Sequence, residues 1–220
     1  MERGRRSGES TGRPRSNRAA GFWSVAALLC LGCAATRPEQ PEDLCAIFSE
    51  RTDWYEAARD SHRRWGVPVP LQLAVIRQES GFNAYARPPR TTFLWIFPGP
   101  RPSSAYGYGQ VLDGTWQAYR DRTGRSSADR DEFEDVVDFI GWYGRVGEER
   151  YGIPKTDPYA FYLSYHQGHA GYARGTHPPS ARTRSVARRV EAQTQRYGRQ
   201  YALCRERLDD AVDGPWWWPF

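Results

Sequence analysis

Beyond its first 35 residues the chain lacks the features that mark several common protein classes. It has no apolar run near the roughly eighteen residues that a membrane span needs, no phosphate-binding loop and no sustained strand-like alternation. Histidine is scarce, and the spacing of His166, His169 and His177 matches no common metal site. We therefore expect neither a polytopic membrane protein nor a sheet-based fold, and we expect no metal or other cofactor.

Excess positive charge is also lacking once the N-terminal segment is set aside. The net charge is +5, but residues 1–32 hold six Arg and two acidic residues. The other 25 basic and 24 acidic residues nearly cancel. A basic surface for nucleic acid is therefore not indicated.

Residues 1–35 have the layout of an export signal, with an Arg-rich start through Arg18 followed by an apolar run. Residues 29–35 resemble a bacterial lipoprotein cleavage box, although Cys30 stands where such boxes usually carry Leu. We expect a signal over residues 1–32, lipidation of Cys33 and a short tether over 33–42. Because Ala34 follows the cysteine, the segment resembles lipoproteins of the outer membrane that face the periplasm. A plain secretory signal or a short N-terminal anchor helix are the alternatives.

Cysteine is scarce too, and export would leave only Cys45 and Cys204 in the domain. In an oxidising periplasm two such cysteines favour one disulfide, Cys45–Cys204, although two buried free thiols remain the alternative. Neither cysteine has the nearby histidine that thiol catalysis needs.

The pattern of apolar residues predicts an all-α domain over residues 43–210. Residues 70–81 form a strongly apolar segment that Pro70 can open and Gly81 can end. The last helix places Cys204 on its packed face, where it can meet Cys45 on the first. The expected helices cover residues 43–65, 70–81, a short stretch after 113, 129–147, 157–167 and 182–208.

Two segments fall outside this helical pattern. The proline-rich loop 87–104 excludes a regular helix and predicts an exposed apolar tip or a short hairpin. We expect it to cover a cleft, touch a membrane or dock a protein partner in the cell envelope. The aromatic tail 211–220 either docks on the domain or contacts a membrane interface or glycan.

Glu79 is the leading candidate for chemistry. It follows the apolar run and lies at the predicted C-terminus of a helix, where the macrodipole is negative. Burial and negative potential both raise the pKa of a carboxyl, as a general acid near neutral pH requires. The alternative is an exposed glutamate at a frayed helix end.

Three motifs occur in the same order as in a known family. Gln78-Glu79-Ser80-Gly81-Phe82, the segment 104–111 and Tyr165-His166-Gln167-Gly168 resemble those of the soluble lytic transglycosylase (SLT) domain. The resemblance covers about Pro70 to Gly175 and implies an all-α, lysozyme-like fold with a substrate cleft. It also implies that the chain acts on glycan strands of peptidoglycan.

The resemblance implies a role for each matching residue. Glu79 would be the sole general acid and then base, cleaving the bond from N-acetylmuramic acid to N-acetylglucosamine with formation of a 1,6-anhydro ring. Ser80 would hydrogen-bond near the cleavage site, and Tyr165 would hold Glu79 by a hydrogen bond. The sugar-binding floor would be formed by Gly107, Tyr108 and Gln110. His166 would either add pH dependence beside the site or lie on a helix surface.

The sequence departs from the family pattern at several positions. Tyr108-Gly109 replaces a usual Leu-Met pair, and His166-Gln167 replaces Asn-Ala. Val186 stands where a late tyrosine is common, which leaves a fourth site residue unassigned. Asp113 is expected to cap a helix rather than to act as a second carboxylate. Two other functions stay open: a hydrolytic muramidase with water as nucleophile, and a non-catalytic glycan-binding envelope lipoprotein.

Overall fold

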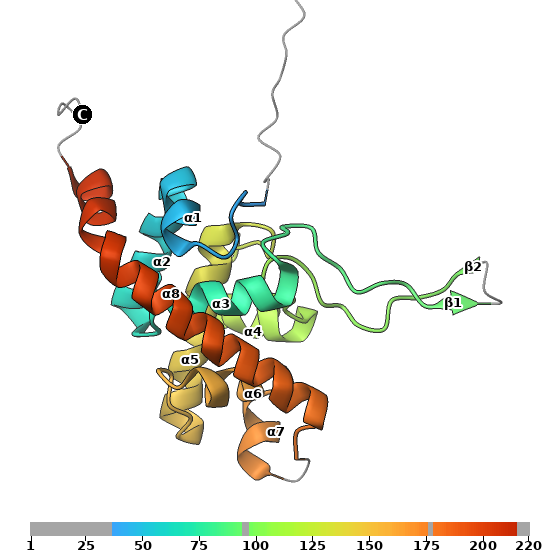
Figure 1. Ribbon diagram of the computed structural model, residues 1–220. Helices are drawn as coiled ribbons and strands as arrows, with labels where there is room; N and C mark the ends of the chain where they lie inside the picture. Colours follow the sequence, from blue (N-terminus) through green and yellow to red (C-terminus); the bar gives the residue numbers. More distant parts are fainter. Residues whose placement is uncertain (1–36, 94–96, 176–177, 215–220) are drawn as a thin grey trace, which may run out of the picture. The chain divides into compact units, whose positions relative to one another are not determined.

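The computed structural model describes residues 37–93, 97–175 and 178–214, which belong to one compact unit (Figure 1). The predicted signal, Cys33 and the aromatic residues 215–220 lie outside these ranges. The described part is mainly helical, as expected for an all-α lysozyme-like domain. Its helices are α1 Leu44–Glu50, α2 Thr52–Trp65, α3 Val69–Ser80, α4 Asp113–Thr123, α5 Phe133–Tyr151, α6 Pro158–Gln167, α7 His169–Arg174 and α8 Ala181–Asp213.

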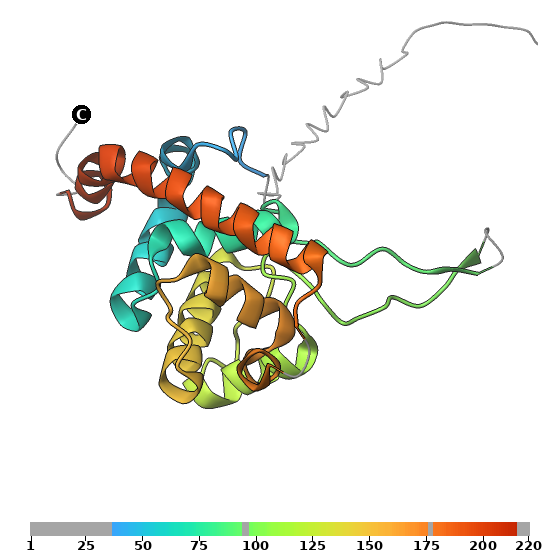
Figure 2. The same ribbon diagram turned by 60° about the horizontal axis from the view of Figure 1, so that its bottom comes forward.

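Helix α3 runs through the centre of the domain. Every residue from Val69 to Ile76 is buried, because α8 packs on one side of the helix and α2 and α5 lie on others. Figures 1 and 2 show α8 running diagonally across α3 toward α6. Trp54 of α2 stacks on Phe133 of α5 with ring centroids 4.0 Å apart and extends the core to the next layer. None of the helices in the described ranges is both long and apolar enough to cross a membrane.

The N-terminal helix is fastened to α8. A disulfide joins Cys45 of α1 to Cys204 of α8, the pair that the sequence predicts. The segment before α1, expected to be a tether, also contacts this helix through a hydrogen bond from the Tyr197 hydroxyl to the Pro41 carbonyl. Arg196 adds an ion pair to Glu42 at 3.1 Å. Residues 41 and 42 are therefore part of the folded domain.

The observed helices differ from the expected ones at three notable points. The expected helix 43–65 divides at Arg51, whose φ of −131° and ψ of 78° are not helical. Helix α5 begins at Phe133 because the Asp129 backbone N–H donates to Asp135 in a preceding turn. Asp113 lies in the first turn of α4 instead of capping it, and pairs with Arg130 at 2.8 Å.

The loop after α3 is a long arm that projects from the helices (Figures 1 and 2). Strands β1 Thr92–Phe93 and β2 Phe97–Pro98 pair antiparallel near its end, which is the short hairpin that the sequence allows. Closer to the body, the Thr91 hydroxyl donates to the Pro100 carbonyl at 2.8 Å. The arm thus lengthens the connection between the first two sequence motifs without adding to the core.

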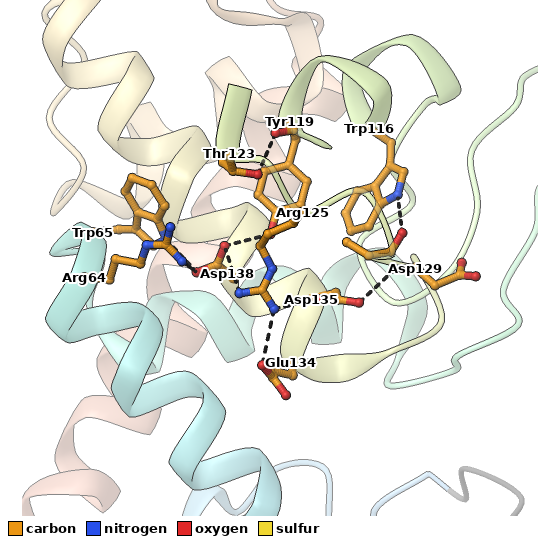
Figure 3. Close-up of polar contacts among 11 residues, drawn as sticks. Arg64, Trp65, Trp116, Tyr119, Thr123, Arg125, Asp129, Glu134, Asp135 and Asp138 are labelled. Carbon is orange, nitrogen blue, oxygen red and sulfur yellow. Dashed lines mark hydrogen bonds and ion pairs between the residues drawn. The ribbon is translucent and has the colours of Figure 1, made fainter. Parts of the chain in front are cut away.

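A buried carboxylate joins three of the helices (Figure 3). Asp138 of α5 is 5% exposed and accepts hydrogen bonds from the Trp65 ring nitrogen at 2.8 Å and the Tyr119 hydroxyl at 2.7 Å. Arg64 approaches it at 3.4 Å and Arg125 at 3.8 Å. These contacts tie α2 and α4 to α5 and satisfy a charge that would otherwise be costly to bury.

Replacing Asp138 with Asn should destabilise the domain by about 2–3 kcal/mol, because an amide hydrogen then faces donors that need an acceptor. The free energy of unfolding from urea denaturation measures this effect. Asp121→Asn, at an exposed position of α4, is the matched control and should change the stability by less than about 0.5 kcal/mol. Equal effects of the two variants would contradict a special role for Asp138.

Candidate active site

The candidate acid lies where α3 ends. Gly81 caps the helix with a φ of 58°, and its N–H donates to the Arg77 carbonyl, so Glu79 falls in the last turn. Phe82 follows with a φ of 63°, which is strained for a residue with a side chain. Its ring is fully buried and stacks on Trp54 at 5.9 Å. That packing fixes the direction in which the chain leaves the site.

Glu79 has the electrostatic character of a general acid. The residue is partly buried, and burial raises the pKa of its carboxyl to about 7. A hydrogen bond from the Tyr162 hydroxyl acts in the opposite direction and limits the rise. Near neutral pH both protonation states are therefore populated, as a group that first donates and then accepts a proton requires.

The hydrogen-bonding tyrosine differs from the expected one. The sequence predicts that Tyr165 holds Glu79, but its hydroxyl donates to the Gly109 carbonyl at 2.7 Å. Tyr162, one turn earlier on α6, donates to Glu79 instead. Tyr165 still lies near the acid, because the Glu79 charge contributes to raising the pKa of its phenol.

Tyr165 links the third motif to the second. A Cβ atom on Gly109 would lie only 2.9 Å from the Tyr165 hydroxyl and 3.2 Å from both Val111 and Val136. A glycine is therefore needed here for the close approach of α6 to the loop. The hydrogen bond fixes the distance between the two motifs.

Two residues expected on the sugar-binding floor belong to the core instead. Tyr108 is 1% exposed and meets the rings of Trp54 and Phe133 edge-on, each at 5.6 Å. Gly107 is buried, and a Cβ on it would lie 1.9 Å from the Arg130 carbonyl. Packing within the protein therefore accounts for the tyrosine and for the glycine at these two positions. The glycine is not needed here to let a glycan approach the backbone.

Gln110 stabilises the loop of the second motif by hydrogen bonds and also lines a pocket. Its amide donates to the carbonyls of Ala86 at 2.9 Å and Gly107 at 3.0 Å. These bonds hold the residue at a φ of 49°, a conformation uncommon for glutamine. Gln110 also lines a pocket of about 220 Å³ that brings the second and third motifs together. The other lining residues are Val111, Leu112, Thr115, Phe139, Tyr143, Tyr165, His166, Gln167 and Gly168.

The remaining predicted residues have less direct relations to the acid. His166 is exposed and lines this pocket. The Ser80 hydroxyl donates to the Ile76 carbonyl of its own helix at 3.2 Å, and its expected contact near the cleavage site stays a prediction. Within the described ranges, which leave out His177, no three His, Cys, Asp or Glu side chains gather as a metal site would require.

Tyr162 is the site residue that the sequence motifs missed. Its spacing of three residues from Tyr165 places both tyrosines on one face of α6, and this helical spacing is the signal that could have found it. Val186 occupies the position of a usual late tyrosine and is partly buried on α8. The hydrogen bond to Glu79 thus comes from Tyr162 of α6 and not from the position on α8 where the family often has a tyrosine.

Replacing Tyr162 with Phe should raise the pKa of Glu79, because burial would then act without an opposing hydrogen bond. If Glu79 acts as the general acid, the alkaline limb of the kcat/KM profile should then move upward by roughly one pH unit. Tyr159→Phe on the same helix is the matched control. An unchanged limb in Tyr162→Phe, or an equal shift in the control, would contradict this assignment.

Comparison with known proteins agrees with this arrangement. The chain matches the family described as "Transglycosylase SLT domain" over residues 22–204. No curated protein sequence matches it. The family match covers all three motifs and the helices that carry Glu79, Tyr162 and Tyr165. The chain therefore belongs to the transglycosylase SLT domain family, whose members are transglycosylase-type enzymes that act on peptidoglycan glycan strands.

Proposed function

We propose that the protein is a lytic transglycosylase that cleaves the bond from N-acetylmuramic acid to N-acetylglucosamine. The observation that carries the proposal is Glu79, a partly buried carboxyl whose pKa is raised to about 7. No carboxylate occurs among the described residues that line the neighbouring pocket. A site with one acid suits a reaction in which the substrate supplies its own nucleophile.

The reaction needs Glu79 twice. In its protonated form Glu79 donates a proton to the glycosidic oxygen as the bond from that oxygen to C1 of the muramic acid breaks. The carboxylate that results accepts the proton of the muramic C6 hydroxyl, and the C6 oxygen bonds to C1 to close the anhydro ring. Glu79 ends the cycle protonated, and no water is consumed.

The neighbouring groups support this exchange. The Tyr162 hydroxyl stabilises the carboxylate form and so lowers the pKa toward neutrality, which favours proton donation in the first half of the reaction and keeps the carboxylate available for the second. The hydrogen bond from Tyr165 to Gly109 holds the pocket wall at a fixed distance from α6. Gln110 and His166 lie at this pocket, where polar side chains can hydrogen-bond sugar hydroxyls.

The reaction products test the proposal against hydrolysis. Sacculi digested with the purified protein should yield muropeptides with anhydro ends, which mass spectrometry separates from reducing ends by the mass of one water. A muramidase, which uses water as nucleophile, would give reducing ends. A non-catalytic glycan-binding protein would bind sacculi and release no muropeptides. Either outcome would overturn the assignment.

We also propose that the protein acts in the cell envelope, on the periplasmic side of the outer membrane. The export-type segment and the lipoprotein-like Cys33 support this location. The Cys45–Cys204 disulfide supports an oxidising compartment. Metabolic labelling with a palmitate analogue, compared between wild type and Cys33→Ala, tests the lipid anchor. Equal labelling of the two would contradict it.

A further inference from the structure

Arg189 of α8 joins no ion pair in the described part of the chain and lies near Tyr162, the tyrosine that hydrogen-bonds Glu79. Arg189 is exposed, and its guanidinium donates one hydrogen bond to the Ser185 hydroxyl at 3.3 Å. Its positive charge acts on Tyr162, the residue that donates to Glu79. Arg189 is therefore within electrostatic range of the tyrosine that contacts Glu79.

The helical repeat of α8 explains this position. Ala187, Val190, Gln193 and Tyr197 form its buried stripe, on which the helix packs against α3 and α6. Arg189 lies at the edge of that stripe and is thus directed along the packed surface toward α6.

Arginines at a spacing of seven share this side of α8, namely Arg182, Arg189 and Arg196. Arg196 is neutralised by Glu42 at 3.1 Å. Among the residues that the structure describes, Arg189 and Arg182 join no ion pair. No acidic partner in the described part of the chain therefore neutralises these two arginines, and the positive end of the helix macrodipole adds to the charge of Arg182 in the first turn. This arrangement suits an anionic ligand.

A second positive group borders the site at the base of the arm. The Ala86 carbonyl accepts from the Gly107 N–H at 3.0 Å and from Gln110, so the arm begins directly on the second motif. The next residue, Arg87, stacks over the Tyr106 ring at 3.9 Å. From Ala84 to Leu112 the sequence contains three arginines and no acidic residue.

We propose that Arg189 and Arg182, with Arg87 at the base of the arm, bind the carboxylates of peptides that branch from the glycan, so that the site prefers peptide-bearing strands to stripped ones. The inference rests on the proposed function, which makes the glycan the substrate. The peptides of peptidoglycan start on the lactyl group of muramic acid, next to the bond that Glu79 would cleave. Their carboxylates are the anionic groups nearest that bond.

The experiment measures binding in the Glu79→Gln background, where no strand is cut. The probes are glycan strands released from sacculi, either with their peptides or after an amidase has removed them. The Glu79→Gln protein should bind the peptide-bearing strands more tightly, and added salt should reduce the difference. Adding Arg189→Gln should weaken binding of peptide-bearing strands about fivefold, the size of one exposed charge pair, and leave binding of stripped strands unchanged.

The control is Arg207→Gln, which removes another exposed α8 arginine that joins no ion pair in the described part of the chain. It lies about 27 Å from Arg189 along the helix and should change neither affinity. Equal binding of both strand types by the Glu79→Gln protein would overturn the proposal. So would equal loss on both strands in Arg189→Gln, or an equal loss in Arg207→Gln. Because binding needs no catalysis, these outcomes are separate from the product test of the lytic reaction.

Discussion

Glu79→Gln should lower the rate of muropeptide release by about 10³-fold or more. General acid and base catalysis each contribute roughly 10²–10⁴-fold, and here one side chain would supply both. Glutamine keeps the size of the side chain but can neither donate nor accept the proton. The measurement is release of anhydro-muropeptides from sacculi, quantified by mass spectrometry.

The same variant should be as stable as the wild type or more stable at alkaline pH. Since burial raises the pKa of Glu79 to about 7 from an ordinary value of 4.5, the folded protein holds a proton that the unfolded chain releases between these values. The stability from the protonated form is complete below pH 4.5 and is lost as the pH rises through 7. Glutamine does not titrate, so Glu79→Gln should lack this loss in thermal unfolding.

The control for both measurements is Glu206→Gln, at an exposed position of α8. It should keep wild-type activity and a wild-type dependence of stability on pH. Activity of Glu79→Gln within tenfold of wild type would refute the role of Glu79 as sole acid and base. Wild-type activity should also fall as the pH rises through about 7, because the protonated fraction of Glu79 falls.

The position of the acid could be predicted from the sequence because its determinants are local. The apolar run before Glu79 and the glycine after it set the burial and the end of α3. The identity of its hydrogen-bond donor depends on tertiary packing. Motif matching selects Tyr165, whereas in the fold Tyr162, one turn earlier on α6, contacts the acid and Tyr165 bonds to Gly109.

The second motif shows the same limit. The resemblance implies that Tyr108 lies on the sugar floor, and a loop has no periodicity that could show instead which side chain faces the core. The Tyr108 ring instead fills the space beside Trp54 and Phe133, which are both far from Tyr108 in the sequence. The resemblance likewise implies that Gly107 contacts glycan, whereas the structure shows that this glycine makes room for the Arg130 carbonyl.

The helices themselves could be predicted closely where an apolar stripe and a capping residue agree. For α6 the Asp157 side chain caps the helix by accepting from two backbone N–H groups, and the helix begins at Pro158, one residue after the predicted start. The break at Arg51 follows no change in the apolar pattern, since Phe48 and Tyr55 pack together across it at 5.1 Å. The break could therefore not be predicted from the apolar pattern, and it is seen only in the backbone angles of Arg51.

Removing the disulfide by Cys45→Ser and Cys204→Ser together should destabilise the domain by about 5 kcal/mol. The bond joins residues 159 positions apart, and closing so long a loop restricts the unfolded chain strongly in the chain-entropy model. This loss is comparable to the total stability of many domains. Urea denaturation of the double variant, compared with the oxidised wild type, measures it.

A reductant provides the matched control for that measurement. Dithiothreitol should lower the denaturation midpoint of the wild type to near that of the double variant and leave the double variant unchanged. Reduction should also free α1 from the middle of α8, while the hydrogen bond from Leu44 to Gln200 remains as a weaker link. Since Glu79 on α3 and Tyr162 on α6 lie on other helices than the two that this bond joins, the folded double variant should retain wild-type kcat at low temperature. A loss of kcat without a loss of stability would contradict a purely structural role for the disulfide.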